Sequence, residues 1–186
     1  MAVIALFLVA TILPALASAQ RTDVQGSLSA DLMFTRIAGH TGTLLGGQAA
    51  LDVGSGLALG GFGYGMLSPV RILGGALPED LRMGYGGILA RLQLASTSYF
   101  DVDGALLLGA GNAQIRAQPI GNQLGSDNFL VFEPRLGVTV PASTPLQGRL
   151  GVGYRLVRSV EDLPRLGASD LRGWTVVLTI SLGGLR

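Results

Sequence analysis

After its first nineteen residues, the chain divides into eight segments in which apolar and polar side chains alternate. Alternation with a period of two places the two sets of side chains on opposite faces of a β-strand. The last segment is the clearest, with Trp174, Val176, Leu178, Ile180 and Leu182 separated by Thr175, Val177, Thr179 and Ser181. The pattern therefore predicts an all-β chain, with strands over the ranges 28–37, 43–53, 56–66, 82–94, 98–112, 127–140, 146–158 and 174–182.

The connections between these segments alternate between long and short. Long connections follow the third, fifth and seventh segments, at Leu67–Leu81, Ala113–Ser126 and Ser159–Asp170. Short ones follow the second, fourth and sixth, and the link Ala38–Gly42 is of intermediate length. Transmembrane barrels have this asymmetry, with short periplasmic turns and longer extracellular loops. We therefore predict an eight-stranded antiparallel up-and-down transmembrane β-barrel.

Charged side chains gather on one face of the segments, while leucine, valine, isoleucine and alanine fill the other. The interior of an eight-stranded barrel has room only for side chains that fill it. The apolar set is too large for that interior, so we expect it outside, whereas inward carboxylates and guanidinium groups can pair. The reverse arrangement would be a soluble, lipocalin-like carrier. The expected lumen charge network consists of Asp31, Asp52, Arg91, Asp101, Asp103, Glu133, Arg135, Arg149 and Arg155.

Three aromatic side chains are expected at one level near the outer rim of the barrel. Phe34 ends the first segment, Tyr154 lies late in the seventh, and Trp174 begins the eighth. Aromatic belts mark both interfaces of a membrane. The sequence therefore predicts an aromatic girdle of Phe34, Tyr154 and Trp174. Tyr64 and Tyr85 lie at the same level, but the pattern does not decide which face they occupy.

The N-terminal segment is almost wholly apolar from Ala2 to Ala17 and continues into Ala17-Ser18-Ala19, the small-x-small pattern that signal peptidase accepts. We expect export and cleavage after Ala19, with an uncleaved membrane anchor as the alternative. Residues 20–186 are then enough for a single barrel domain. No other stretch approaches the roughly 18 consecutive apolar residues of a membrane helix.

Composition excludes several functional classes. Charged residues make up 13% of the chain, compared with about 25% in soluble domains. The net charge is +1 and the arginines are scattered, which argues against nucleic-acid binding. There is no cysteine, so disulfides and thiolate metal sites are excluded.

Short glycine-aromatic and polar motifs recur in a fixed order: Gly60–Gly65, Met83–Gly87, Leu108–Gly111, Phe132–Pro134, Gly153–Arg155 and Ser169–Gly173. In this order the chain resembles a family of small, mostly uncharacterised bacterial outer-membrane β-barrel proteins. The similarity spans about Gly46 to Gly184. It implies the barrel architecture and an outer-membrane location, and it carries no enzymatic activity across.

Two groups of residues could carry chemistry. His40, the only histidine, falls in the first outer loop, and Ser68, Ser126 and Asp127 are conceivable partners in a lipid-modifying triad. No spacing selects them, so a solvated loop histidine is the preferred interpretation. Asp101 and Asp103 could begin a calcium loop, but Ala105 to Leu108 provide no oxygen ligands. We expect both carboxylates to face the lumen, paired with Arg91 or Arg149.

The sequence thus favours a monomeric, non-enzymatic outer-membrane barrel with a plugged polar lumen and a structural or interaction role through its extracellular loops. We expect no cofactor, no metal and no nucleic acid. The expected partners are outer-membrane lipid and, during insertion, the barrel-assembly machinery. A small-solute channel, a soluble carrier and a lipid-modifying enzyme are the alternatives.

Overall fold

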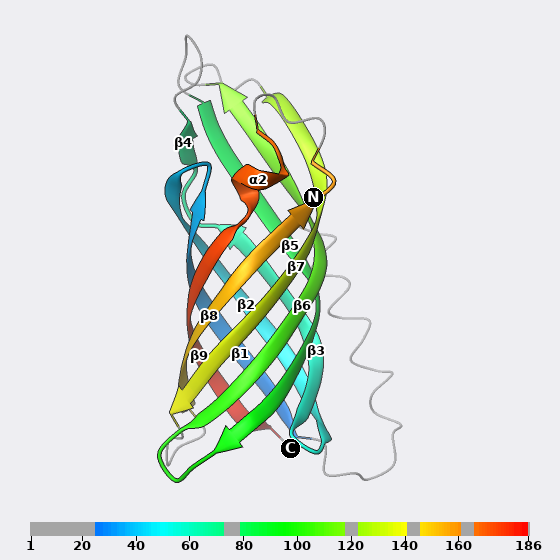
Figure 1. Cartoon of the computed structure of the whole chain (residues 1–186), viewed down its shortest axis with the longest axis vertical. Helices are drawn as coiled ribbons and strands as arrows, with labels where there is room; N and C mark the ends of the chain where they lie inside the picture. The colour runs from blue at the N-terminus through cyan, green and yellow to red at the C-terminus, as the bar shows by residue number, and fades with distance from the viewer. Residues whose placement is uncertain (1–24, 73–78, 118–122, 141–145, 161–165, 186) are drawn as a thin grey trace.

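Eight long strands pair edge to edge until the sheet closes on itself (Figure 1). This computed structural model describes residues 25–72, 79–117, 123–140, 146–160 and 166–185, so the expected signal peptide lies outside the described residues. The barrel strands are β1 (Gly26–Ile37), β2 (His40–Gly54), β3 (Leu57–Met66), β5 (Glu79–Ser96), β6 (Asp101–Ala117), β7 (Gln123–Val140), β8 (Leu146–Arg158) and β9 (Gly173–Leu185).

Every neighbouring pair of strands in the barrel is antiparallel. Pairing of β1 with β9 and of β3 with β5 closes the sheet. The predicted eight-stranded antiparallel barrel is therefore confirmed. Two short elements are added at the end of the barrel that carries the longer connections: strand β4 (Val70–Ile72), which pairs with β5, and helix α2 (Ala168–Leu171), which contacts β8 and β1.

Several strand ends differ from the sequence prediction. β5 begins at Glu79, β6 continues to Ala117 and β7 begins at Gln123, so much of two predicted loops is strand (Figure 1). The cause is a polar outer face on these extensions, where Asn112 Nδ2 donates to Ser126 Oγ at 3.0 Å and to Asn128 Oδ1 at 3.1 Å across β6 and β7. The inner face here is apolar, at Leu81, Ala113 and Ile115, so the alternation is inverted relative to the rest of the barrel wall and the strands are not recognised.

Two turns also differ from the prediction. The link at Ala38–Gly42 is a two-residue turn at Ala38 and Gly39, with φ of 49° and 79°, and β2 begins at His40. Two successive positive φ angles are typical of a tight hairpin whose twist matches that of its strands. The turn expected at 95–97 lies between Ser96 and Asp101 instead, where Thr97 Oγ1 donates to the carbonyl oxygen of Phe100 at 2.8 Å.

The apolar set of side chains faces outward along the barrel. Ile88, Leu136 and Ile180 are each at least 60% exposed, whereas Glu133 and Arg155 on the inner face are 0% exposed. Exposing apolar surface to water costs roughly 25 cal/mol per Å², so this outer face is suited to lipid. The arrangement is the reverse of that in a soluble carrier with an apolar interior. Within the described part of the chain, no helix is both long and apolar enough to cross a membrane.

Candidate functional site in the barrel lumen

An ion-paired group occupies the end of the lumen at which β1 begins and β9 ends. Arg149 of β8 reaches Asp103 of β6, with Nε donating to Oδ2 at 2.8 Å and Nη2 to Oδ1 at 2.5 Å. Arg91 of β5 lies on the other side of this carboxylate, with its Nε 3.9 Å from Asp103 Oδ1. The bidentate geometry is the stronger form of a charge-assisted hydrogen bond.

A second group lies next along the lumen and is joined to the first through Gln48. Arg91 Nη2 donates to Gln48 Oε1 at 2.5 Å, and Gln48 Nε2 donates to Asp31 Oδ2 at 2.5 Å. The Tyr64 hydroxyl donates to the same Asp31 oxygen at 2.6 Å. Asp31, Gln48 and Tyr64 are at most 5% exposed, so β1, β2 and β3 meet here inside the barrel.

A third group surrounds Glu133 of β7. Arg135 Nε donates to Glu133 Oε1 at 2.7 Å, and the Thr175 hydroxyl donates to the same oxygen at 2.8 Å. The Tyr85 hydroxyl donates to Glu133 Oε2 at 2.9 Å. Arg135 Nη1 also donates to the Tyr64 oxygen at 2.7 Å, which links this group to the second.

These contacts form one continuous polar network from Arg149 to Thr175. The network contains three guanidinium groups and three carboxylates, so its formal charges cancel: Arg91, Arg135, Arg149, Asp31, Asp103 and Glu133. Pairing and hydrogen bonding are what allow charges to be removed from water. Groups hydrogen-bonded in series also hold one another in a single arrangement.

Arg155 of β8 lies beyond the network, beneath helix α2. Its Nε donates to the carbonyl oxygen of Leu171 at 2.9 Å, its Nη2 donates to Thr35 Oγ1 at 3.2 Å, and its guanidinium carbon lies 5.7 Å from the centre of the Tyr85 ring. Leu171 is 0% exposed, and the backbone nitrogen of Ala38 donates to the Asp170 carbonyl oxygen at 2.7 Å. Helix α2 is thus bonded to β8 and to the β1–β2 turn while its leucine packs inside the barrel.

The lumen also contains an aromatic cluster that the sequence did not reveal. Tyr64 and Tyr85 face inward, with ring centres 5.4 Å apart, and both contact Phe62. Phe129 contacts Tyr85 on the far side, at 6.4 Å. The sequence hint for this cluster was that both tyrosines are flanked by glycines. The structure places the two tyrosines opposite each other in the β3–β5 register. The lumen is therefore filled by apolar as well as charged side chains.

Glycines on the inner wall make room for the arginines. A Cβ added at Gly137 would overlap the guanidinium group of Arg149. One added at Gly153 would lie 2.6 Å from Cγ of Arg135. Spacing this short is below van der Waals contact, so any larger residue at these positions would displace the arginine.

Asp52 and Asp101 do not join the network, contrary to expectation. Asp52 is exposed, and its Oδ1 accepts a hydrogen bond from the Gly54 nitrogen at 2.7 Å in the β2–β3 turn. Asp101 accepts a weaker one from Gln93 Nε2 at 3.3 Å, and no ion pair joins it to Arg91 or Arg149 in the described structure. Both residues lie at strand ends, where the inner face is open to solvent.

The three residues of the expected girdle lie on neighbouring strands and point outward. Trp174 of β9 is 69% exposed and Phe34 of β1 is 38% exposed. Tyr154 of β8 packs edge-on against Trp174, with ring centres 5.3 Å apart. Because the strand order is β1–β9–β8, these rings form one outward aromatic patch rather than a complete ring.

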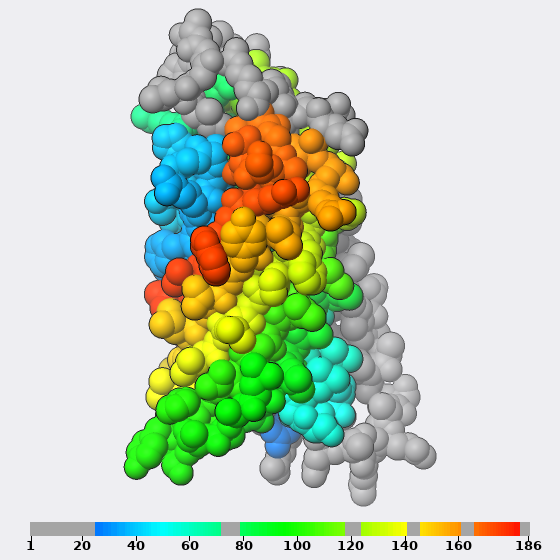
Figure 2. Space-filling model, in the orientation of Figure 1, coloured from blue at the N-terminus to red at the C-terminus, as the bar shows by residue number. Residues whose placement is uncertain are grey.

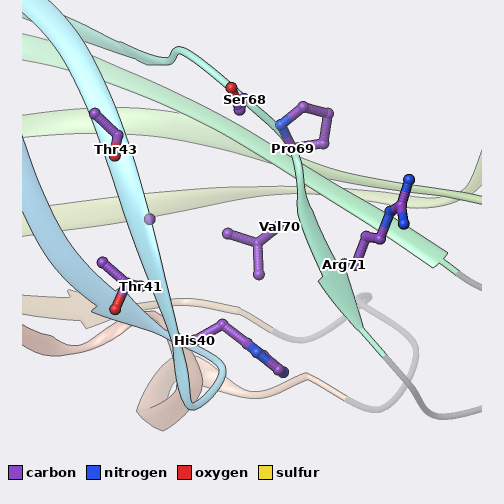
Figure 3. Close-up of a pocket in the computed structure, with 8 residues that line it drawn as sticks. His40, Thr41, Thr43, Ser68, Pro69, Val70 and Arg71 are labelled. Atoms are coloured by element: carbon purple, nitrogen blue, oxygen red, sulfur yellow. The ribbon is translucent and has the colours of Figure 1, made fainter.

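His40 is the first residue of β2 and not a loop residue, and it lines a pocket at the surface. Figure 3 shows His40 at the start of β2 and Ser68 on the segment before β4, with the Val70 side chain between them in this view. Ser126 and Asp127 are not among the lining residues and pair with β6 instead. The eight lining residues include no carboxylate, and no group suited to binding a metal occurs among the residues that the structure describes. The hypothetical triad is therefore not assembled.

Comparison with known proteins identifies the fold. No protein-family model matches the chain, and no curated protein matches it in sequence. Among solved structures, neisserial surface protein A is similar over 87% of this chain and 97% of its own, with a TM-score of 0.59 and 12% identity. The attachment invasion locus protein Ail of Yersinia pestis, solved with the heparin analogue sucrose octasulfate, is similar over 87% of this chain and 99% of its own. Its TM-score is 0.55 and its sequence identity is 11%.

A third similar structure is a major outer membrane protein of Thermus thermophilus, which covers 86% of this chain and 98% of its own at a TM-score of 0.53 and 14% identity. These matches each cover 86% or 87% of the chain. The chain therefore has the fold of the small outer-membrane β-barrel proteins.

Proposed function

We propose that this protein is a non-enzymatic barrel of the bacterial outer membrane whose lumen is plugged by its own side chains. The observation that carries the proposal is the continuous network from Arg149 to Thr175, together with the aromatic cluster beside it. A barrel of eight strands has an interior just wide enough for side chains to fill. Such a lumen stabilises the barrel and leaves no continuous water path.

The outward apolar face supports the membrane location. Exposed leucine, valine and isoleucine cover the middle of the barrel, and Trp174 and Tyr154 border them on one side. Apolar bands flanked by aromatic residues are typical of outer-membrane barrels. The interactions of the protein are then made at the end that carries α2 and β4, where the outer faces of β6 and β7 become polar at Asn112, Ser126 and Asn128.

Fractionation with heat-modifiability tests this location. Outer-membrane and periplasmic fractions from cells that express the full chain are run on SDS gels with and without boiling. We expect a band in the outer-membrane fraction that migrates faster when unboiled, because a closed barrel resists detergent. A soluble periplasmic band with no shift would contradict the proposal and favour a carrier.

A small-solute channel is the second candidate, because the fold is also compatible with a pore. Its path would have to pass Glu133 and Arg155, both 0% exposed, and then the buried Leu171 of α2. These side chains are held by hydrogen bonds to three different strands and to α2. We therefore favour the plugged barrel.

The enzyme alternative has a direct test. His40→Ala is compared with Thr41→Ala, a neighbour that lines the same pocket. We expect both variants to leave the lipid composition of the outer membrane unchanged. A change that appears with His40→Ala alone would contradict the non-enzymatic proposal.

A further inference from the structure

Three outward arginines gather at the extracellular ends of neighbouring strands. Arg36 is the penultimate residue of β1, Arg158 is the last residue of β8, and Arg172 immediately precedes β9. All three are exposed, and β9 lies between β1 and β8 in the sheet. Figure 2 shows this part of the surface, where the blue end of β1 and β2 borders the orange of α2 and the adjoining strand ends.

Backbone contacts place the three side chains in one cluster. A Cβ at Gly173 would lie 3.9 Å from Cβ of Arg36, so the residue after Arg172 adjoins β1. On the other side, Arg172 Nε donates to the carbonyl oxygen of Val157 at 3.0 Å, one residue from Arg158. Arg155 lies opposite Gly173 and Thr35 opposite Thr175, so Arg158 lies about four residues farther along the sheet than Arg36. Two strand spacings of about 4.8 Å and this offset separate the ends of the cluster by about 16 Å.

The depth of this arginine cluster follows from the aromatic patch below it. Phe34 precedes Arg36 by two residues, Trp174 follows Arg172 by two, and Tyr154 lies on the strand that ends with Arg158. Residues two apart on a strand point to the same face and are separated by roughly 7 Å. Tryptophan and tyrosine lie at headgroup level in membranes. Arg36 and Arg172 are therefore at the height of lipid phosphates, and Arg158, four residues after Tyr154, lies about two residues farther out.

The charge of the cluster is not balanced by nearby acids in the described structure. No described carboxylate lies within 4.0 Å of the three guanidinium groups. Asp170, two residues before Arg172, accepts a hydrogen bond from the Gly167 nitrogen at 2.9 Å at the start of α2, and Glu161 and Asp162, which follow Arg158, lie outside the described residues. On the opposite wall, by contrast, the exposed Arg116 lies directly across from Asp80 in the β5–β6 register.

We propose that Arg36, Arg158 and Arg172 bind the phosphate groups of an anionic membrane lipid whose acyl chains lie against the aromatic patch and the apolar wall below. Guanidinium groups bind phosphate through two parallel hydrogen bonds. A soluble anion would use the arginines alone, but the cluster is continuous with the exposed side chains of Leu156, Trp174 and Val176. This inference rests on the proposed membrane location and is independent of whether the lumen is plugged.

The test measures stabilisation of the refolded full chain by a defined lipid. The protein is placed in phosphatidylcholine vesicles with or without bisphosphorylated lipid A, and the temperature at which half of the folded gel band is lost is recorded. We expect lipid A to raise this midpoint for the wild type, and the variant R36Q/R158Q/R172Q to lose the increase while keeping its midpoint in phosphatidylcholine. The control R82Q/R116Q, on the opposite wall, should retain it.

A single variant and a soluble anion complete the test of lipid binding. The side chain of Arg158 forms no ion pair within 4.0 Å in the described structure. The single variant R158Q should therefore weaken the apparent affinity for lipid A about tenfold, which corresponds to the loss of one charge-assisted contact. An equal midpoint increase in the wild type and the triple variant would overturn the proposal. An equal increase with inorganic pyrophosphate would assign the cluster to a soluble anion instead. If the barrel conducts ions but responds to lipid A as expected, the proposal of a plugged lumen is contradicted and the proposal of lipid binding is not.

Discussion

Arg135 and Tyr64 meet inside the barrel although they lie 71 residues apart in the chain, with Nη1 of the arginine donating to the phenol oxygen at 2.7 Å. The guanidinium carbon also lies 4.9 Å from the centre of the tyrosine ring. This contact joins the group around Asp31 to the group around Glu133. The two halves of the lumen network are therefore coupled through one hydroxyl.

Removing that hydroxyl should destabilise the barrel. Tyr64→Phe leaves the ring in place but deprives Asp31 of a donor and Arg135 of an acceptor. Leaving buried polar groups unpaired costs about 1–3 kcal/mol each. We expect a loss of this size in the free energy of unfolding, measured by urea titration in detergent micelles. Tyr154→Phe, on the outer face, should change it much less, and equal losses in the two variants would contradict the role of the hydroxyl.

Asp103 and Asp101 provide a matched pair on one strand. They lie two residues apart on β6, but Asp103 bonds Arg149 twice whereas Asp101 accepts one long hydrogen bond from Gln93. Removing one partner of a buried ion pair typically costs about 3–5 kcal/mol. Asp103→Asn should therefore lower the unfolding free energy strongly and Asp101→Asn only slightly. Similar effects of the two substitutions would mean that depth in the lumen does not matter.

A glycine on the inner wall should resist substitution where it faces an arginine. Gly137→Ala places a methyl group on the guanidinium of Arg149, and overpacking of this kind costs about 1–3 kcal/mol. Gly148→Ala is the control, because nothing lies within 4 Å of its added Cβ. The thermal midpoint of the folded gel band should fall for Gly137→Ala alone. An unchanged midpoint would show that Arg149 can occupy another position.

Helix α2 should contribute to stability through its single buried leucine. Leu171→Ala removes a side chain that is 0% exposed, and such substitutions cost about 2–5 kcal/mol. The exposed Ser169→Ala on the same helix is the control. Urea unfolding should distinguish the two variants. If Leu171→Ala is as stable as the wild type, α2 does not pack firmly over the lumen.

The sequence was sufficient to predict the number of strands and the face of most side chains, because an apolar outer wall and a polar inner wall produce strict alternation. It failed where one of these conditions is absent. Asn112 and Ser126 are polar and point outward, so the strands continue unrecognised above the apolar wall. Tyr64 and Tyr85 are surrounded by glycines, which carry no face preference, and their inward position had to come from the structure.

Depth along the barrel was the second quantity that the sequence did not provide. Alternation gives the same inward face to Asp101 and Asp103, yet only Asp103 is deep enough to pair with arginine. The partners of each charge depend on contacts between strands that are not neighbours, such as Arg149 of β8 and Asp103 of β6. Contacts of this kind require the closed barrel.

Single-channel recording in planar bilayers tests the central proposal most directly. The refolded wild-type chain is compared with a variant that removes two buried, ion-paired side chains from the lumen, Arg135→Ala combined with Glu133→Ala, whose folding is verified by the unboiled gel band. The proposal predicts no unitary currents from the wild type, whose Glu133 and Arg135 side chains are at most 3% exposed. Stable, reproducible unitary currents from the wild type would contradict a plugged lumen and identify the protein as a channel.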